Sequence, residues 1–335
     1  VSENNDVSSG SGSIFHGGEP PEDETGSRPW LDLSTGISPV AYPFSTLATA
    51  TWQILPRQRD EQRTLDAAGH YFGNSHPGNI CMGAGSQALL QAIPCLFPPG
   101  KVAVFSPTYA EHAWRWTEVG HSVVEIFDLD NVEADCRYVV LVNPNNPTGE
   151  SHAPDRLLEL ATMLAARGGY LVVDEAFCDV MPEISVARHA GRPGLLVLRS
   201  FGKFFGLAGA RIGFLLGPSE FIAAVREKSG LWPVNGPALA IATEAYEDVS
   251  WIESHRKMLT ERTARLRELL KGHGRIIGST DLFVLLAAKS APALLAKLAA
   301  QQIHVRHFPE NPEWLRFGLP DKEEDWLRLH SGLIG

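Results

Sequence analysis

The stretch LLVLRSFGKFFGLAGARIGF, residues 195–214, decides how the rest of the chain is interpreted. Its aliphatic start is typical of a buried strand, and the glycines after Ser200 predict a loop. Lys203 stands among phenylalanines and glycines, where scarce water lowers the pKa of an amine and frees it to attack a carbonyl group. Ser200 and Arg211 flank it with phosphate-binding groups. This combination suggests pyridoxal 5'-phosphate (PLP), although a surface lysine and a salt-bridged arginine are the simpler alternative.

The composition excludes several classes of protein. The chain has 335 residues, 44% apolar and 20% charged, which is ordinary for a globular protein of two domains. A net charge of -10 without a basic stripe argues against nucleic-acid binding. No stretch is apolar enough for a membrane span, and the polar first residues are expected to be a disordered leader rather than a signal peptide.

The four cysteines lie far apart, without a CxxC pair. This spacing predicts neither a disulfide framework nor a metal site, and a reducing cytoplasm fits best.

Apolar segments and helical segments alternate through the middle of the chain. This alternation predicts an α/β protein with a large doubly wound, mostly parallel sheet. The expected strands are 80–82, 102–105, 123–127, 138–142, 170–173 and 195–198. The alternation of strand-like and helical segments in residues 275–335 predicts a small α+β domain. We therefore expect a flexible arm at 1–44 that packs partly with the small domain, a large domain at 45–230 and a small domain at 231–335.

Polar residues follow the expected strands, at the edge where ligands bind in α/β sheets. Tyr109 could stack on a flat ring, and Asp174 could meet a protonated pyridine nitrogen. Asn146 and Lys203 should converge on the same place. The alternatives are a helix cap or salt bridge for Asp174 and a turn position for Asn146.

The segment GAGSQA, residues 83–88, resembles a dinucleotide-binding fingerprint. A dehydrogenase also needs an acidic residue at the end of the next strand, and that strand ends in Ser-Pro-Thr-Tyr, residues 106–109. The segment is therefore expected to hold a phosphate at a helix start instead.

Further candidates lie near the two ends of the chain. His16 could donate to an anion, and Gly36 allows close backbone approach. Arg306 and Arg316 interrupt apolar strand patterns, so each either extends outward to solvent or faces a cleft and binds an anion.

Five motifs in this order resemble the fold type I PLP-dependent enzymes of the class I and II aminotransferase group. They are GSQ (85–87), PTY (107–109), NPNNPTG (143–149), DEAF (174–177) and the stretch around Lys203. The resemblance implies that Lys203 binds the PLP aldehyde and Asp174 pairs with the ring nitrogen. Asn146 would bind the ring hydroxyl, and Tyr109 would stack on the ring. The other cofactor-binding residues would be Gly85, Ser86, Gln87, Ser200 and Arg211, and the substrate-binding residues His16, Gly36, Asn146, Arg306 and Arg316.

Within this group, the HGG (16–18), DLSTGISP (32–39) and VNGPA (234–238) segments look like the threonine-phosphate decarboxylases of cobalamin biosynthesis. Phe177 fits them, because these decarboxylases tolerate phenylalanine at a position where many aminotransferases have a tyrosine. Histidinol-phosphate aminotransferases are the alternative, and a non-catalytic PLP-binding regulator is a distant third. The resemblance also implies a homodimer that takes a small phosphorylated amino acid.

Overall fold

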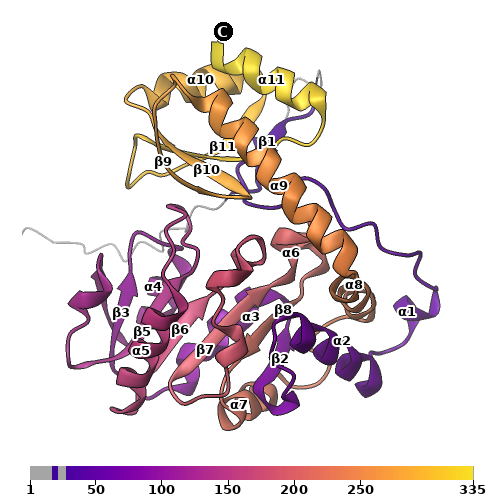
Figure 1. The fold of residues 1–335 in the computed structure, drawn as a ribbon, viewed down its shortest axis with the longest axis vertical. Helices are drawn as coiled ribbons and strands as arrows, with labels where there is room; N and C mark the ends of the chain where they lie inside the picture. Colours follow the sequence, from indigo (N-terminus) through magenta and orange to yellow (C-terminus); the bar gives the residue numbers. More distant parts are fainter. Residues whose placement is uncertain (1–16, 22–27, 335) are drawn as a thin grey trace, which may run out of the picture.

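Two β-sheets of different size carry the fold (Figure 1). The computed structural model describes residues 17–21 and 28–334. The larger sheet has the strand order β2-β8-β7-β6-β5-β3-β4. Its strands are β2 (Ile80–Gly83), β3 (Lys101–Phe105), β4 (Ser122–Ile126), β5 (Cys136–Val142), β6 (Tyr170–Asp174), β7 (Leu195–Ser200) and β8 (Gly213–Leu216). Every pairing from β7 to β4 is parallel, and β8 is antiparallel to both of its neighbours.

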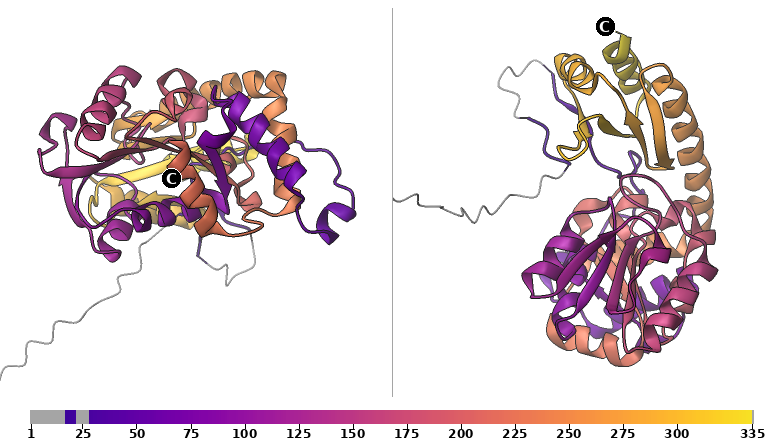
Figure 2. Two further views of the ribbon diagram at one scale, coloured as in Figure 1. Left: turned by 90° about the horizontal axis from the view of Figure 1, so that it is seen from below. Right: turned by 90° about the vertical axis from the view of Figure 1, so that its left-hand side faces the viewer.

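Alternate residues of the central strands enter two separate apolar cores, one on each face of this sheet. One core packs β-strand residues against α2 (Gln58–Tyr71), α5 (Pro154–Ala165) and α8 (Gly236–Glu247). The other packs them against α3 (Gly85–Ala92), α4 (Glu111–Glu118) and α7 (Ser219–Ser229). Helices therefore cover both faces (Figure 2), which explains why these strands are almost wholly apolar. We call this sheet with its helices the large domain.

The smaller sheet has the order β1-β11-β12-β10-β9. Its strands are β1 (Leu31–Leu33), β9 (Arg275–Thr280), β10 (Phe283–Ala287), β11 (Ile303–His307) and β12 (Trp314–Gly318). With α10 (Ala291–Ala300) and α11 (Glu323–Ile334) it forms what we call the small domain. The long helix α9 (Val249–Leu270) runs between the two domains (Figure 1).

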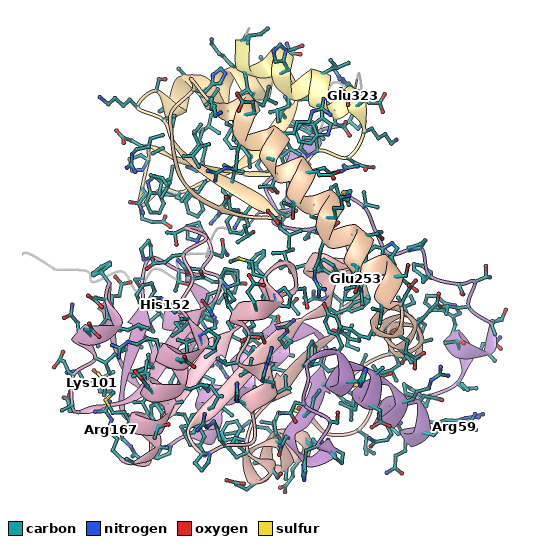
Figure 3. The ribbon with its side chains drawn as sticks, in the orientation of Figure 1. Arg59, Lys101, His152, Arg167, Glu253 and Glu323 are labelled. Carbon is teal, nitrogen blue, oxygen red and sulfur yellow. The ribbon has the colours of Figure 1, made fainter. Side chains whose placement is uncertain are left out.

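The orientation of the large sheet decides where its polar strand ends lie. Lys101 begins β3, whereas His152 follows the carboxyl end of β5. In Figure 3, His152 lies nearer the small domain than Lys101 does. The carboxyl ends of the parallel strands therefore face the small domain, and a ligand site at this edge lies between the two sheets.

The predicted α/β class and mostly parallel sheet are confirmed. Pro56 separates the short helix α1 (Ala50–Gln53) from α2, as expected for a helix break. The sequence did not predict β1, β8 or α4, and the short helix α6 (Phe201–Phe204) begins where a loop is expected after Ser200. The strands β1 and β8 are only three and four residues long, too short for a recognisable pattern. The expected start of a small domain at 231 stays a prediction, and α8, which follows it, packs against α2. No helix among the described residues is long and apolar enough to cross a membrane.

Candidate active site

A cavity of about 450 Å³ lies at the carboxyl ends of the parallel strands. Residues from both domains line it, including every candidate that the structure describes: Gly36, Gly85, Ser86, Gln87, Tyr109, Asn146, Asp174, Ser200, Lys203, Arg211, Arg306 and Arg316. His16 lies outside the described residues. The volume is typical of a site for a cofactor or another small molecule.

Lys203 lies in α6 (Phe201–Phe204), directly after β7. Phe201 and Phe204 beside it are fully buried. The pKa of Lys203 is lowered to about 8, chiefly by burial and then by the positive charge of Arg316, with Arg211 adding to the shift and Asp174 opposing it. The neutral, nucleophilic fraction of this amine near neutral pH is therefore much larger than that of an exposed lysine.

Two neighbours restrain the surroundings of Lys203. Its backbone carbonyl accepts a hydrogen bond of 2.8 Å from the backbone N–H of Ser38. Its Nζ atom lies 5.7 Å from the centre of the Phe177 ring. A Cβ atom on Gly36 would lie only 2.7 Å from that ring, so a residue without a side chain is required here. The segment that follows β1 therefore also packs against α6, the helix that carries Lys203.

Asp174 ends β6 and is buried. Its Oδ1 accepts a hydrogen bond of 3.0 Å from the backbone N–H of Ala176, and its Oδ2 lies 3.0 Å from Nε2 of His112. An ionised carboxylate only accepts hydrogen bonds, so Nε2 of His112 donates to it. His112 was not a candidate from the sequence, because α4 was not predicted. The only hint in the sequence that His112 belongs to the site is its spacing of three residues from Tyr109.

The start of α3 and the residue Arg211 approach each other closely. Gly85 has a φ of 78°, and a Cβ atom there would lie 2.6 Å from a guanidinium nitrogen of Arg211. Glycine therefore permits both the backbone conformation and the contact. Ser86 and Ser200 line the cavity with them. Backbone N–H groups at a helix start, two hydroxyls and a guanidinium form a cradle suited to a phosphate group.

Tyr109 belongs to a hydrogen-bonded chain that includes Gln87 and Glu111. Its hydroxyl donates to Oε1 of Gln87 at 3.3 Å, and Nε2 of Gln87 donates to Oε2 of Glu111 at 2.9 Å. Burial raises the pKa of Tyr109 to about 12, with Glu111 and Asp174 contributing. The phenol therefore stays protonated at neutral pH, and it can act as a donor but not as a base.

Arg306 and Arg316 face each other across the antiparallel strands β11 and β12. Arg316 is buried and donates to the carbonyl of Ser34 at 2.7 Å and to Oδ1 of Asn146. Its Nε atom is buried without a hydrogen-bond partner among the described residues. Burial and, to a smaller extent, the positive charge of Arg306 lower the pKa of Arg316 to about 10.

Like charges directly opposite each other destabilise a sheet. The arrangement therefore favours an anion between the two guanidinium groups. Both arginines face the cavity instead of extending outward to solvent.

The described residues contain no group of three histidine, cysteine or acidic side chains that could hold a metal ion. The site therefore offers a nucleophilic amine, a buried carboxylate, a phosphate cradle and an arginine pair.

Comparisons with known proteins agree with this chemistry. The family described as aminotransferase class I and II matches residues 46–328. The chain is 43% identical to a threonine-phosphate decarboxylase of Pseudomonas aeruginosa, over 91% of this chain and 92% of that protein. It is 40% identical to the enzyme of the same name from a Sinorhizobium species, over 93% and 95% of the two chains. A solved histidinol-phosphate aminotransferase from Clostridium acetobutylicum shares the fold, with a TM-score of 0.76, 22% identity and coverage of 90% and 98%.

Proposed function

The chain belongs to the family of class I and II aminotransferases, and on that premise we propose that it decarboxylates L-threonine O-3-phosphate. The products would be CO2 and (R)-1-amino-2-propanol O-2-phosphate, which serves the corrinoid side chain in cobalamin biosynthesis. Two relatives that carry the name threonine-phosphate decarboxylase are at least 40% identical to this chain, and each match covers more than 90% of both chains. The observation that carries the proposal is the opposed pair Arg306 and Arg316, which can bind the two anionic groups of this substrate.

The cofactor is PLP, and the residues of the cavity fit it. Lys203 would hold its aldehyde, and the cradle of Gly85, Ser86, Ser200 and Arg211 would hold its phosphate. Asp174 would keep the ring nitrogen protonated, Asn146 would bind the ring hydroxyl, and Tyr109 would stack on the ring, with Gln87 holding the Tyr109 hydroxyl. When bound, PLP withdraws the electrons that bond cleavage at the substrate Cα releases.

The protein's own contribution is orientation and proton transfer. The bond that breaks must stand perpendicular to the cofactor ring, and a charge clamp on the carboxylate and phosphate sets that angle. Arg316 would take the carboxylate, because it is the more deeply buried guanidinium and contacts Asn146. Arg306, with His16, would take the phosphate, and Gly36 would contact the substrate through its backbone at the cavity wall. After CO2 departs, the ammonium group of Lys203 can supply the proton that Cα gains.

An aminotransferase acting on histidinol phosphate is the second candidate. It would bind a phosphorylated amine in the same cavity, but it would need a 2-oxo acid acceptor, and Lys203 would remove the proton from Cα. The solved neighbour of that name is only 22% identical, which supports the fold alone.

The test is to mix the PLP-loaded protein with L-threonine O-3-phosphate, without any 2-oxo acid, and to follow CO2 release. We expect release in catalytic amounts, and none from unphosphorylated L-threonine at the same concentration. If no CO2 appears and amino transfer from histidinol phosphate to 2-oxoglutarate does, the aminotransferase replaces this proposal and the cofactor assignment stands.

We also propose a homodimer. An apolar surface formed by Trp52, Ile54, Leu55, Leu231 and Trp232 is exposed, with Leu231 79% and Trp52 68% accessible. Leu231 and Trp232 line one groove with Pro56, the residue that follows Leu55 in the chain. Such a patch is typical of an interface. Sedimentation velocity at micromolar concentration would test it, and a monomer would contradict it.

A cytoplasmic location is part of the same proposal. All four cysteines are free thiols, which suits a reducing compartment.

A further inference from the structure

One acidic residue of the cavity has no role in the reaction described above. The lining contains four cationic side chains, Lys203, Arg211, Arg306 and Arg316, and two carboxylates, Asp174 and Glu310. Asp174 is buried and held by His112, whereas Glu310 is exposed. Within residues 17–21 and 28–334, Glu310 is therefore the only lining carboxylate that an incoming anion meets at the solvent side.

The turn that carries Glu310 is held by its own backbone. Residues 308–313 connect β11 to β12, the strands of Arg306 and Arg316. The N–H of Asn311 donates to the carbonyl of Phe308 at 3.0 Å, and the N–H of Trp314 donates to the carbonyl of Asn311 at 2.8 Å. Pro309 and Pro312 follow the first residue of each turn, where proline presets the backbone. Glu310 is thus held in place beside the cavity.

Arg306, Phe308 and Glu310 line the same cavity, and all three belong to the β11–β12 hairpin. The guanidinium carbon of Arg306 lies 5.2 Å from the centre of the Phe308 ring, and Glu310 is two residues further on. Opposite charges that line one cavity attract each other. In agreement, the negative charge of Glu310 opposes the lowering of the pKa of Arg306 that burial causes.

We propose that Glu310 is a counter-charge that competes with the substrate phosphate for Arg306 and so limits its binding. This inference rests on the proposed function, because it takes the ligand to be a phosphate ester. Glu310 would offset part of the charge of the arginine pair while the site is empty, and it would repel the phosphate as it enters. The carboxylate thereby weakens the binding of every phosphorylated ligand.

This weakening has a physical use in the proposed reaction. Substrate and product keep the same phosphate, so contacts to it stabilise the substrate, the transition state and the product equally. Such uniform binding does not speed the bond cleavage, and when it is too tight it slows the release of product. A carboxylate beside the phosphate-binding arginine limits this binding without touching the reacting atoms.

The experiment compares Glu310→Gln with wild type as PLP-loaded proteins. Dissociation constants are measured from the absorbance of the cofactor, with the proposed product (R)-1-amino-2-propanol O-2-phosphate and with unphosphorylated 1-amino-2-propanol as probes, because the substrate itself would be turned over. Glu310→Gln should tighten binding of the phosphorylated probe by up to about fivefold, the upper end for one exposed charge pair. Binding of the unphosphorylated probe should be unchanged. The matched control is Glu313→Gln, an exposed acid in the same turn that does not line the cavity.

Unchanged or weaker binding of the phosphorylated probe in Glu310→Gln would overturn the inference. Weaker binding would mean that Glu310 positions Arg306 for the ligand. An equal effect of Glu313→Gln would also overturn it, because the charge of the turn as a whole would then be responsible. The proposed function has a test of its own, and it would be wrong if the wild-type protein released no CO2 from L-threonine O-3-phosphate. Phosphorylated histidinol, compared with histidinol, would still test Glu310 in that case.

Discussion

Replacing Arg316 with methionine should abolish productive substrate binding and leave cofactor binding nearly intact. Arg316 is buried, and its contacts are the carbonyl of Ser34 and the side chain of Asn146. If it binds the substrate carboxylate, the variant leaves that carboxylate unpaired in a buried site, which costs about 3 kcal/mol or more. The value of kcat/KM for L-threonine O-3-phosphate should therefore fall by at least roughly 100-fold.

The cofactor phosphate cradle lies on other elements, at the start of α3 and around Arg211. We therefore expect the dissociation constant of PLP, measured by equilibrium dialysis, to change less than about threefold, well under 1.4 kcal/mol. CO2 release gives kcat/KM, and thermal unfolding shows whether the variant is folded. Arg316→Lys, which keeps the charge and loses the planar fork, should recover only part of the activity.

The matched control is Arg328→Met. Arg328 is also a buried arginine of the small domain, and it donates to the carbonyls of Gln301 and Gln302 at 2.8 and 2.6 Å. It does not line the cavity, so this variant should lower the melting temperature without raising KM. The reasoning would be refuted if Arg316→Met weakened PLP and substrate binding equally, or if Arg328→Met reproduced its kinetic effect.

Three further predictions concern the cofactor side of the cavity. Lys203→Ala should keep the wild-type circular dichroism and melting temperature but lose turnover, and normal turnover would exclude Lys203 as the attachment point. Gly85→Ala should weaken PLP binding at least tenfold, because a Cβ atom would lie 2.6 Å from Arg211 at a φ of 78°; the matched change Gly209→Ala, where a Cβ atom meets nothing within 4 Å, should have no effect. The rate of covalent PLP attachment should rise with pH, with a midpoint near pH 8, the pKa of Lys203. In Arg316→Met this midpoint should move to higher pH, because the positive charge of Arg316 favours the neutral amine. A midpoint that stays in place would mean that Arg316 does not act on Lys203.

Much of the fold was predictable because its strongest signals are local. Apolar runs of three to five residues, separated by helical segments, indicate a parallel sheet wherever they occur. The elements that the sequence missed include β1, β8 and α4. The three residues of β1 have no recognisable pattern of their own, and they form a strand only because β11 lies beside them. Similarly, β8 is four residues long, and it lies between β7 and β2, the second of which is at least 130 residues earlier in the chain.

The sequence by itself determined which residues could meet at one edge of the large sheet. Tyr109, Asn146, Asp174 and Lys203 each follow a strand or a strand-like run, and the carboxyl ends of parallel strands share an edge whatever the details of packing. Only the tertiary structure decided that Arg306 and Arg316 face the cavity and oppose each other. That outcome depends on the register of β11 against β12, and a shift of one residue would have turned a guanidinium to the other face. The contact of His112 with Asp174 and the position of Glu310 likewise depend on long-range packing, which no local pattern records.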